Sequence, residues 1–217
     1  MRKFVPDFIA ENYENGKYSG LLHCVTLFAD ISGFTSSAEE LSKHGKEGSE
    51  VLSDMIHVLF EKTAEIIRSR NGFVTKYIGD AFISFFPHDN TPESEKAAFI
   101  NAISAGFELG RYFLKNGEID TKFGNFFFGL KIGIGTGVNN WKIIGRNNIR
   151  TYYFEGKSLW SATSAEKKIR PGEIAISSSV CEKYSDLINA VPSGRSGYSK
   201  LVSIRNSSAG SACCIDY

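Results

Sequence analysis

Apolar and polar residues follow two different periods along this chain, one typical of strands and one typical of helices. Near-continuous apolar runs that end in turn residues predict buried strands at 22–29 and 126–137. Apolar residues at helical spacing predict amphipathic helices at about 49–69, 93–114 and 158–169. Shorter strand patterns, several of them in hairpin pairs, occupy 73–78, 81–86, 141–144, 151–154, 173–177 and 198–204.

The order of these elements indicates the fold class. It runs strand, helix, hairpin, helix, hairpin, helix, strand, strand, which is typical of an α+β protein with helices packed on a sheet. A ferredoxin-like βαββαβ core with additional strands and helices fits best. With 217 residues the chain suggests one domain at 21–205, a lead-in at 1–20, and a flexible tail or truncation point at 206–217.

Composition removes several classes of function. Lys plus Arg is 25 and Asp plus Glu is 24, so the formal net charge of +1 argues against a nucleic-acid partner. No apolar run approaches the ~18 residues of a membrane span. The four cysteines form no disulfide or zinc pattern, and we expect reduced thiols in a cytoplasmic protein.

Two carboxylates are candidates for chemistry. Asp30 follows the first apolar strand and Asp80 lies at the tip of the next hairpin, and adjacent strands would bring the two together. Two such carboxylates can hold two divalent cations that clamp a phosphoryl group. On spacing alone, a pair of turn-forming aspartates is the simpler interpretation.

The residues after Asp30 favour the chemical interpretation. Gly33 allows a tight turn, and the amides that follow it are free to point at phosphate. Lys76 lies four residues before Asp80, so strand alternation predicts the same face for both side chains. A cation there indicates a nucleotide contact, and an ordinary solvated strand lysine is the alternative.

Three segments then resemble the class III nucleotidyl cyclases, the adenylyl and guanylyl cyclase catalytic domains. They are LFADISGFT at 27–35, KYIGDAF at 76–82 and KIGIGTG at 131–137, in the family's order and at its separations. The resemblance implies a head-to-tail dimer that converts a nucleoside triphosphate, ATP ahead of GTP, to its 3′,5′-cyclic monophosphate and pyrophosphate. It also implies two divalent cations, Mg²⁺ or Mn²⁺.

The resemblance carries roles to particular residues. Asp30 and Asp80 match the two metal-binding aspartates, and the backbone carbonyl of Ile31 matches a further ligand. Lys76 matches the lysine that contacts the purine base. The phosphate-facing turn of the family is matched by Gly33, Phe34 and Thr35.

Three positions depart from the family pattern. Trp160 stands where the family has the asparagine that orients the ribose, Ser164 replaces the arginine that stabilises phosphate charge, and Tyr153 replaces the purine-selecting residue. The pattern resembles the first catalytic half of soluble, bicarbonate-responsive adenylyl cyclases. It implies a homodimer or, in preference for activity, a second cyclase domain as the partner.

Two further possibilities stay open. Lys167 and Lys168 follow Ser164 by about one helical turn and can replace part of the missing arginine charge, or they are solvated lysines at a helix end. The whole domain can also act as a catalytically weak regulatory partner that binds nucleotide. A two-metal phosphoesterase fits less well, because its usual histidine cluster is missing from the sequence.

Overall fold

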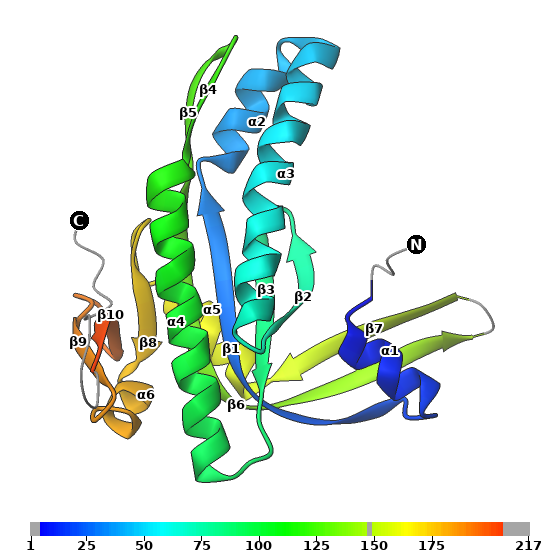
Figure 1. Cartoon of the computed structure of the whole chain (residues 1–217), viewed down its shortest axis with the longest axis vertical. Coiled ribbons are helices and arrows are strands. Elements are labelled where there is room, and N and C mark those ends of the chain that lie inside the picture. Colours follow the sequence, from blue (N-terminus) through cyan, green and yellow to red (C-terminus); the bar gives the residue numbers. More distant parts are fainter. Residues whose placement is uncertain (1–4, 147–148, 206–217) are drawn as a thin grey trace.

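A mixed sheet with helices on both faces forms the body of the molecule in the computed structural model, which describes residues 5–146 and 149–205 (Figure 1). The sheet has the strand order β2-β3-β1-β6-β8-β10-β9, and β7 pairs with β6 alone. Its strands are β1 (Ser19–Ser32), β2 (Phe73–Ile78), β3 (Ala81–Pro87), β6 (Gly129–Arg146), β7 (Ile149–Gly156), β8 (Ile174–Ser177), β9 (Ile188–Pro192) and β10 (Tyr198–Ile204).

The central strands confirm the predicted ferredoxin-like core. β1 is followed by α3 (Gly45–Ser69), β2, β3, α4 (Pro92–Asn116) and β6, and the spatial order of these strands is β2-β3-β1-β6. Every neighbouring pair among them is antiparallel. The predicted fold class is therefore confirmed.

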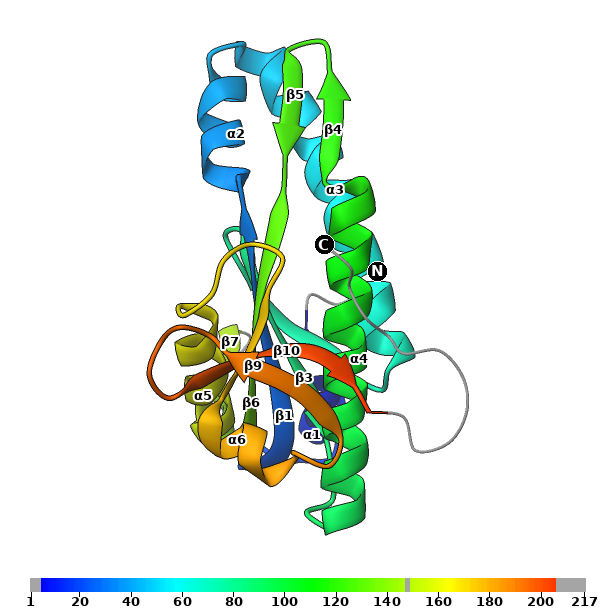
Figure 2. The same cartoon turned by 90° about the vertical axis from the view of Figure 1, so that its left-hand side faces the viewer.

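The main core lies between the sheet and the two long helices. Alternate residues of β1, namely Val25, Leu27, Ala29 and Ile31, are buried in it together with the apolar stripes of α3 and α4. Each helix presents a single apolar face, as their sequence spacing predicts. Figure 2 shows α3 and α4 on one side of the sheet and α5 (Lys157–Glu166) on the other.

Helix α5 packs unusually close to β6 because β6 carries glycines on that face. A Cβ on Gly133 would lie 2.0 Å from the carbonyl oxygen of Ala162, and one on Gly135 would lie 2.3 Å from that of Ser158. Alternate glycines in the strand thus let the backbone of α5 lie directly on the sheet. Glycine inside a strand is typical of such a close approach between two backbones.

Several element boundaries differ from the sequence prediction. β1 extends to Ser32, so Asp30 lies inside the strand rather than after it, because β1 pairs on both sides, with β3 and with β6. The strand predicted at 126–137 is divided between β5 (Gly124–Phe127) and the 18-residue β6. Helix α5 ends at Glu166, three residues before the predicted end.

Other elements were not predicted. They are α1 (Asp7–Glu14) within the lead-in, α2 (Phe34–Ser42), β4 (Glu118–Thr121), α6 (Ser178–Lys183) and β9. Hairpin β4–β5 and helix α2 extend the molecule beyond one end of the sheet, beside the start of α3 (Figure 1). The predicted tail at 206–217 lies outside the described residues. Within the described ranges, no helix is long and apolar enough to cross a membrane.

Candidate functional site

Asp30 and Asp80 come together where β1 meets the β2–β3 hairpin. Asp30 lies opposite Ala81, the first residue of β3, and Asp80 immediately precedes Ala81 in the turn before that strand. The amide of Ile31 donates a hydrogen bond to the carbonyl oxygen of Asp80 at 3.0 Å. The two aspartates, fifty positions apart in sequence, are thus neighbours across one strand pair, as the sequence predicts.

The turn after β1 brings Thr35 to the same place. Gly33 has a φ of +91°, in the left-handed region that favours glycine, and it immediately precedes α2. A Cβ on Gly33 would lie 2.1 Å from the carbonyl oxygen of Phe127, so this position has no room for a side chain. Phe34 packs against the main core, and the hydroxyl of Thr35 donates to Oδ2 of Asp80 at 3.3 Å.

Lys76 requires a correction. Asp80 lies in the two-residue turn between β2 and β3, outside either strand, so strand alternation does not relate its side chain to that of Lys76. The register instead places Lys76 opposite Ile83, and Ile83 opposite Phe28 of β1. Paired residues share a face and so do residues two apart, so Lys76 lies on the same sheet face as Asp30. Its side chain is exposed there.

A third charged group, which the sequence analysis did not single out, contacts Asp30 directly. Lys131 lies opposite Asp30 in the β1–β6 ladder, and its Nζ is 2.7 Å from Oδ2 of Asp30. The same ammonium forms an ion pair with Oε1 of Glu166, the last residue of α5. The sequence signal that could have indicated Lys131 is a lysine between two apolar residues, Leu130 and Ile132, within a predicted strand.

The three side chains differ in their exposure. The Glu166 side chain is 6% exposed, while Lys131 is 23% and Asp30 is 26% exposed. Burial alone would lower the pKa of the Lys131 ammonium, but its hydrogen bonds to Asp30 and Glu166 outweigh burial and raise that pKa. Lys131 therefore stays positively charged, and it is paired with the buried carboxylate of Glu166 and the half-buried carboxylate of Asp30.

The three departures from the family pattern lie on β7 and α5. Trp160 is 78% exposed and Tyr153 is 39% exposed, while Ser164 is half-buried. The buried residues of α5 are Ser158, Ala162, Ala165 and Glu166. An exposed tryptophan on a helix whose opposite face packs on the sheet leaves a large apolar group at the surface.

Lys167 and Lys168 lie beyond the end of α5. Lys167 is the C-cap residue, so the prediction that both continue the helix is wrong. Nζ of Lys168 lies 5.8 Å from the centre of the Tyr198 ring in β10. Lys168 therefore contacts the β10 side of the sheet, and Lys167 is exposed.

The donor atoms near Asp30 suit a hard divalent cation in kind but are few. Asp30 and Asp80 provide carboxylate oxygens, which Mg²⁺ and Mn²⁺ prefer, and Mg²⁺ sites often combine one or two carboxylates with substrate phosphates. Within the part of the chain that the structure describes, no group of three or more His, Cys, Asp or Glu residues could hold a metal. The residues thus fit a cation that also takes oxygens from a substrate.

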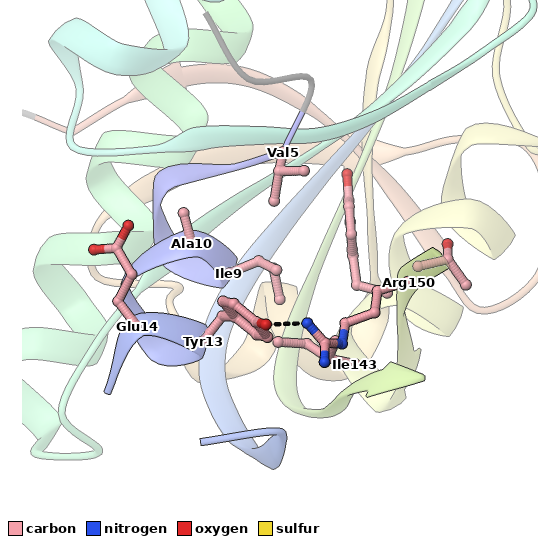
Figure 3. Close-up of a pocket in the computed structure, with 9 residues that line it drawn as sticks. Val5, Ile9, Ala10, Tyr13, Glu14, Ile143 and Arg150 are labelled. Atoms are coloured by element: carbon pink, nitrogen blue, oxygen red, sulfur yellow. Dashed lines mark hydrogen bonds between the residues drawn. The ribbon is translucent and has the colours of Figure 1, made fainter. Parts of the chain in front are cut away.

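A separate pocket of about 270 Å³ lies between α1 and the β6–β7 arm (Figure 3). Apolar side chains of Val5, Ile9 and Ile143 line it, and Arg150 donates a hydrogen bond to the hydroxyl of Tyr13 across it. This pocket shares no residue with the group around Asp30. It is a consequence of α1 docking on the arm.

Comparison with known families identifies the domain. The family model for the adenylate and guanylate cyclase catalytic domain matches residues 18–195. The chain therefore belongs to this family, which converts nucleoside triphosphates to cyclic nucleotides. A search of curated proteins by sequence finds no match.

Solved structures of cyclase domains share the fold. The adenylyl cyclase CyaB from P. aeruginosa superposes with a TM-score of 0.67 at 22% identity, over 88% of this chain and 99% of that chain. A dimeric guanylyl cyclase domain of the RhoGC fusion protein from Blastocladiella emersonii gives 0.68 at 17% identity, over 87% and 99%. The guanylate cyclase domain of RhGC from Catenaria anguillulae, solved in complex with GTP, gives 0.65 at 16% identity, over 86% and 100%.

Proposed function

We propose that this chain is the metal-binding half of a nucleotidyl cyclase, which makes a 3′,5′-cyclic purine monophosphate and pyrophosphate at a dimer interface. The observation that carries the proposal is the adjacency of Asp30 and Asp80 across the β1–β3 pair, beside the Gly33 turn. In the reaction the 3′-hydroxyl forms a bond to the α-phosphorus, and the bond to the pyrophosphate oxygen breaks.

Each residue has a distinct proposed role. Asp30, Asp80 and the carbonyl of Ile31 would hold two divalent cations, Mg²⁺ or Mn²⁺, which when bound neutralise charge on the triphosphate. The first amides of α2, at Phe34 and Thr35, have no partner within the helix and can donate to phosphate oxygens. The exposed Lys76 would contact the base.

The resemblance to a particular group of cyclases suggests the substrate, and the residues at positions 160 and 164 suggest the partner. We place ATP ahead of GTP as substrate, by the resemblance to the first half of soluble, bicarbonate-responsive adenylyl cyclases. In a homodimer, each metal half would face Trp160 and Ser164 in place of asparagine and arginine. Loss of one transition-state donor typically costs ~10²–10³ in rate. A second cyclase domain that carries both missing residues is therefore the proposed partner, in the cytoplasm.

Neutral isosteres of the two aspartates test the proposal. Asp30→Asn and Asp80→Asn each remove a hard ligand while keeping the side-chain shape, and each should lower cyclic nucleotide formation by at least ~10²-fold. Activity is measured with ATP and with GTP, in Mg²⁺ and in Mn²⁺, for the chain alone and mixed with a cyclase domain that carries the asparagine and arginine. Asp120→Asn, at an exposed carboxylate in β4, is the matched control. Full activity of both variants in the mixture would exclude the two-carboxylate assignment.

A second candidate function is regulatory. Trp160 and Ser164 favour a catalytically weak cyclase-homology domain that binds nucleotide and acts through its partner. In that case, Asp30→Asn would leave product formation by the mixture unchanged. Replacement of Trp160 at the exposed face of α5 by serine would weaken the partner's activation instead.

A further inference from the structure

The contact between Lys131 and Asp30 has a consequence for cation binding. An ammonium 2.7 Å from Oδ2 of Asp30 occupies the same carboxylate that the proposed function assigns to a divalent cation. Two like charges cannot share one carboxylate oxygen at that distance without strong repulsion. A divalent cation that binds Asp30 must therefore displace the Lys131 ammonium from Oδ2. Otherwise it must bind the other carboxylate oxygen of Asp30 despite the electrostatic repulsion from that ammonium.

The fold fixes where a displaced ammonium would go. Glu166 holds Lys131 from the opposite side, and its carboxylate is 6% exposed at the end of α5. The α5 backbone is locked against β6 at this point, since a Cβ on Gly133 would lie 2.6 Å from the amide nitrogen of Glu166. Gly133 and Lys131 are two apart on β6 and share that face. Glu166 is thus a rigid anchor, whereas Asp30 sits at the more open end.

We propose that Lys131 is the built-in counter-ion of Asp30 in the cation-free domain, and that Glu166 retains Lys131 when a divalent cation takes Asp30. This proposal rests on the function proposed above. Lys131 and Glu166 are positioning residues in this scheme, because neither needs to touch substrate. The competition between Asp30 and Glu166 for the Lys131 ammonium sets how tightly the site binds its divalent cation in the absence of nucleotide.

The proposal makes opposite predictions for the two partners. Lys131→Met removes the competing ammonium, so the Kd for Mn²⁺ should fall about tenfold. Glu166→Gln leaves Asp30 as the one carboxylate that Lys131 contacts among the described residues, so the Kd should rise by a similar factor. A merely structural ion pair would weaken Mn²⁺ binding in both variants, because both would loosen α5 on β6.

The double variant separates competition from overall charge. Lys131→Met combined with Glu166→Gln keeps the formal charge of the wild type, because one positive and one negative group are lost together. If the ammonium competes for Asp30, the double variant still binds Mn²⁺ more tightly than the wild type. It also leaves no buried carboxylate unpaired, so it serves where Lys131→Met alone fails to fold.

Mn²⁺ binding to the full chain without nucleotide, measured by electron paramagnetic resonance and calorimetry, provides the test. Lys200→Met is the control, because Lys200 pairs with Glu173 at 2.8 Å with similar exposure, in a pair that includes neither Asp30 nor Asp80. Tighter binding by the double variant supports the proposal, and binding equal to or weaker than the wild type overturns it. Failure of Asp30→Asn to weaken Mn²⁺ binding would refute the proposed function instead.

Discussion

A single added carbon on β6 should separate α5 from the sheet. In the variant Gly133→Ala, the new Cβ would lie 2.0 Å from the carbonyl oxygen of Ala162, and real Cβ atoms essentially never approach within 3.0 Å. The backbone of α5 must therefore move away by about 1 Å. The atoms that the new Cβ would meet, such as the oxygen of Ala162 and the nitrogen of Glu166, belong to the main chain and cannot rotate away.

The expected cost follows from that displacement. Overpacking a filled interior typically costs 1–3 kcal/mol, and a backbone clash belongs at the upper end, so the free energy of unfolding should fall by about 3 kcal/mol. For a chain of this length, that lowers Tm by roughly 6–12 °C. The shift also moves Glu166 away from Lys131, and a misplacement of about 1 Å at a site can reduce turnover ~10²-fold.

Urea unfolding and thermal melts of Gly133→Ala provide the measurement, with Gly106→Ala as the control. Gly106 lies inside α4, where an added Cβ would meet only the flexible ends of side chains: Ile174 at 3.3 Å, Ile134 at 3.7 Å and Ile132 at 3.9 Å. Alanine also improves helix propensity there by about 1 kcal/mol, so this variant should match or exceed the wild type. Stability of Gly133→Ala within about 0.5 kcal/mol of the wild type would refute the reasoning about close packing.

Three further predictions concern the buried Cys24 thiol, the lysines after α5, and the asparagine and arginine that Trp160 and Ser164 replace. Burial raises the pKa of the Cys24 thiol to about 11 from 9.0, so stability present below pH 9 should be lost as pH rises toward 11. By pH 10 the urea midpoint should indicate a loss of about 1 kcal/mol relative to Cys24→Ala, and parallel pH profiles would contradict this. Because Lys168 contacts Tyr198, Lys167 is the better candidate to replace the positive charge of the arginine that Ser164 replaces. Lys167→Ala should lower turnover more than nucleotide affinity, and Lys168→Ala should leave both unchanged. Trp160→Asn combined with Ser164→Arg should raise the activity of the chain alone by at least ~10²-fold, and no gain would argue for the regulatory function.

Local pattern was sufficient for the central elements. The apolar run around Leu27, the two long helices and the β2–β3 hairpin appear where the sequence predicts them, because a buried strand and a one-sided helix each require a characteristic spacing. The adjacency of Asp30 and Asp80 was also predictable, since both residues end or interrupt apolar strands. Short elements such as α1 and β9 were missed because their few residues carry too weak a period.

The sequence alone thus determined the order of the central strands and helices, the fold class and the adjacency of Asp30 and Asp80, because these follow from short-range spacing and residue type. Only the tertiary structure decided that Lys131 contacts Asp30 and that Glu166 anchors it. Those residues meet because β6 pairs with β1 in one register and because glycines admit α5 onto β6. Register and interlayer distance depend on contacts between segments far apart in the chain, and no local period encodes them.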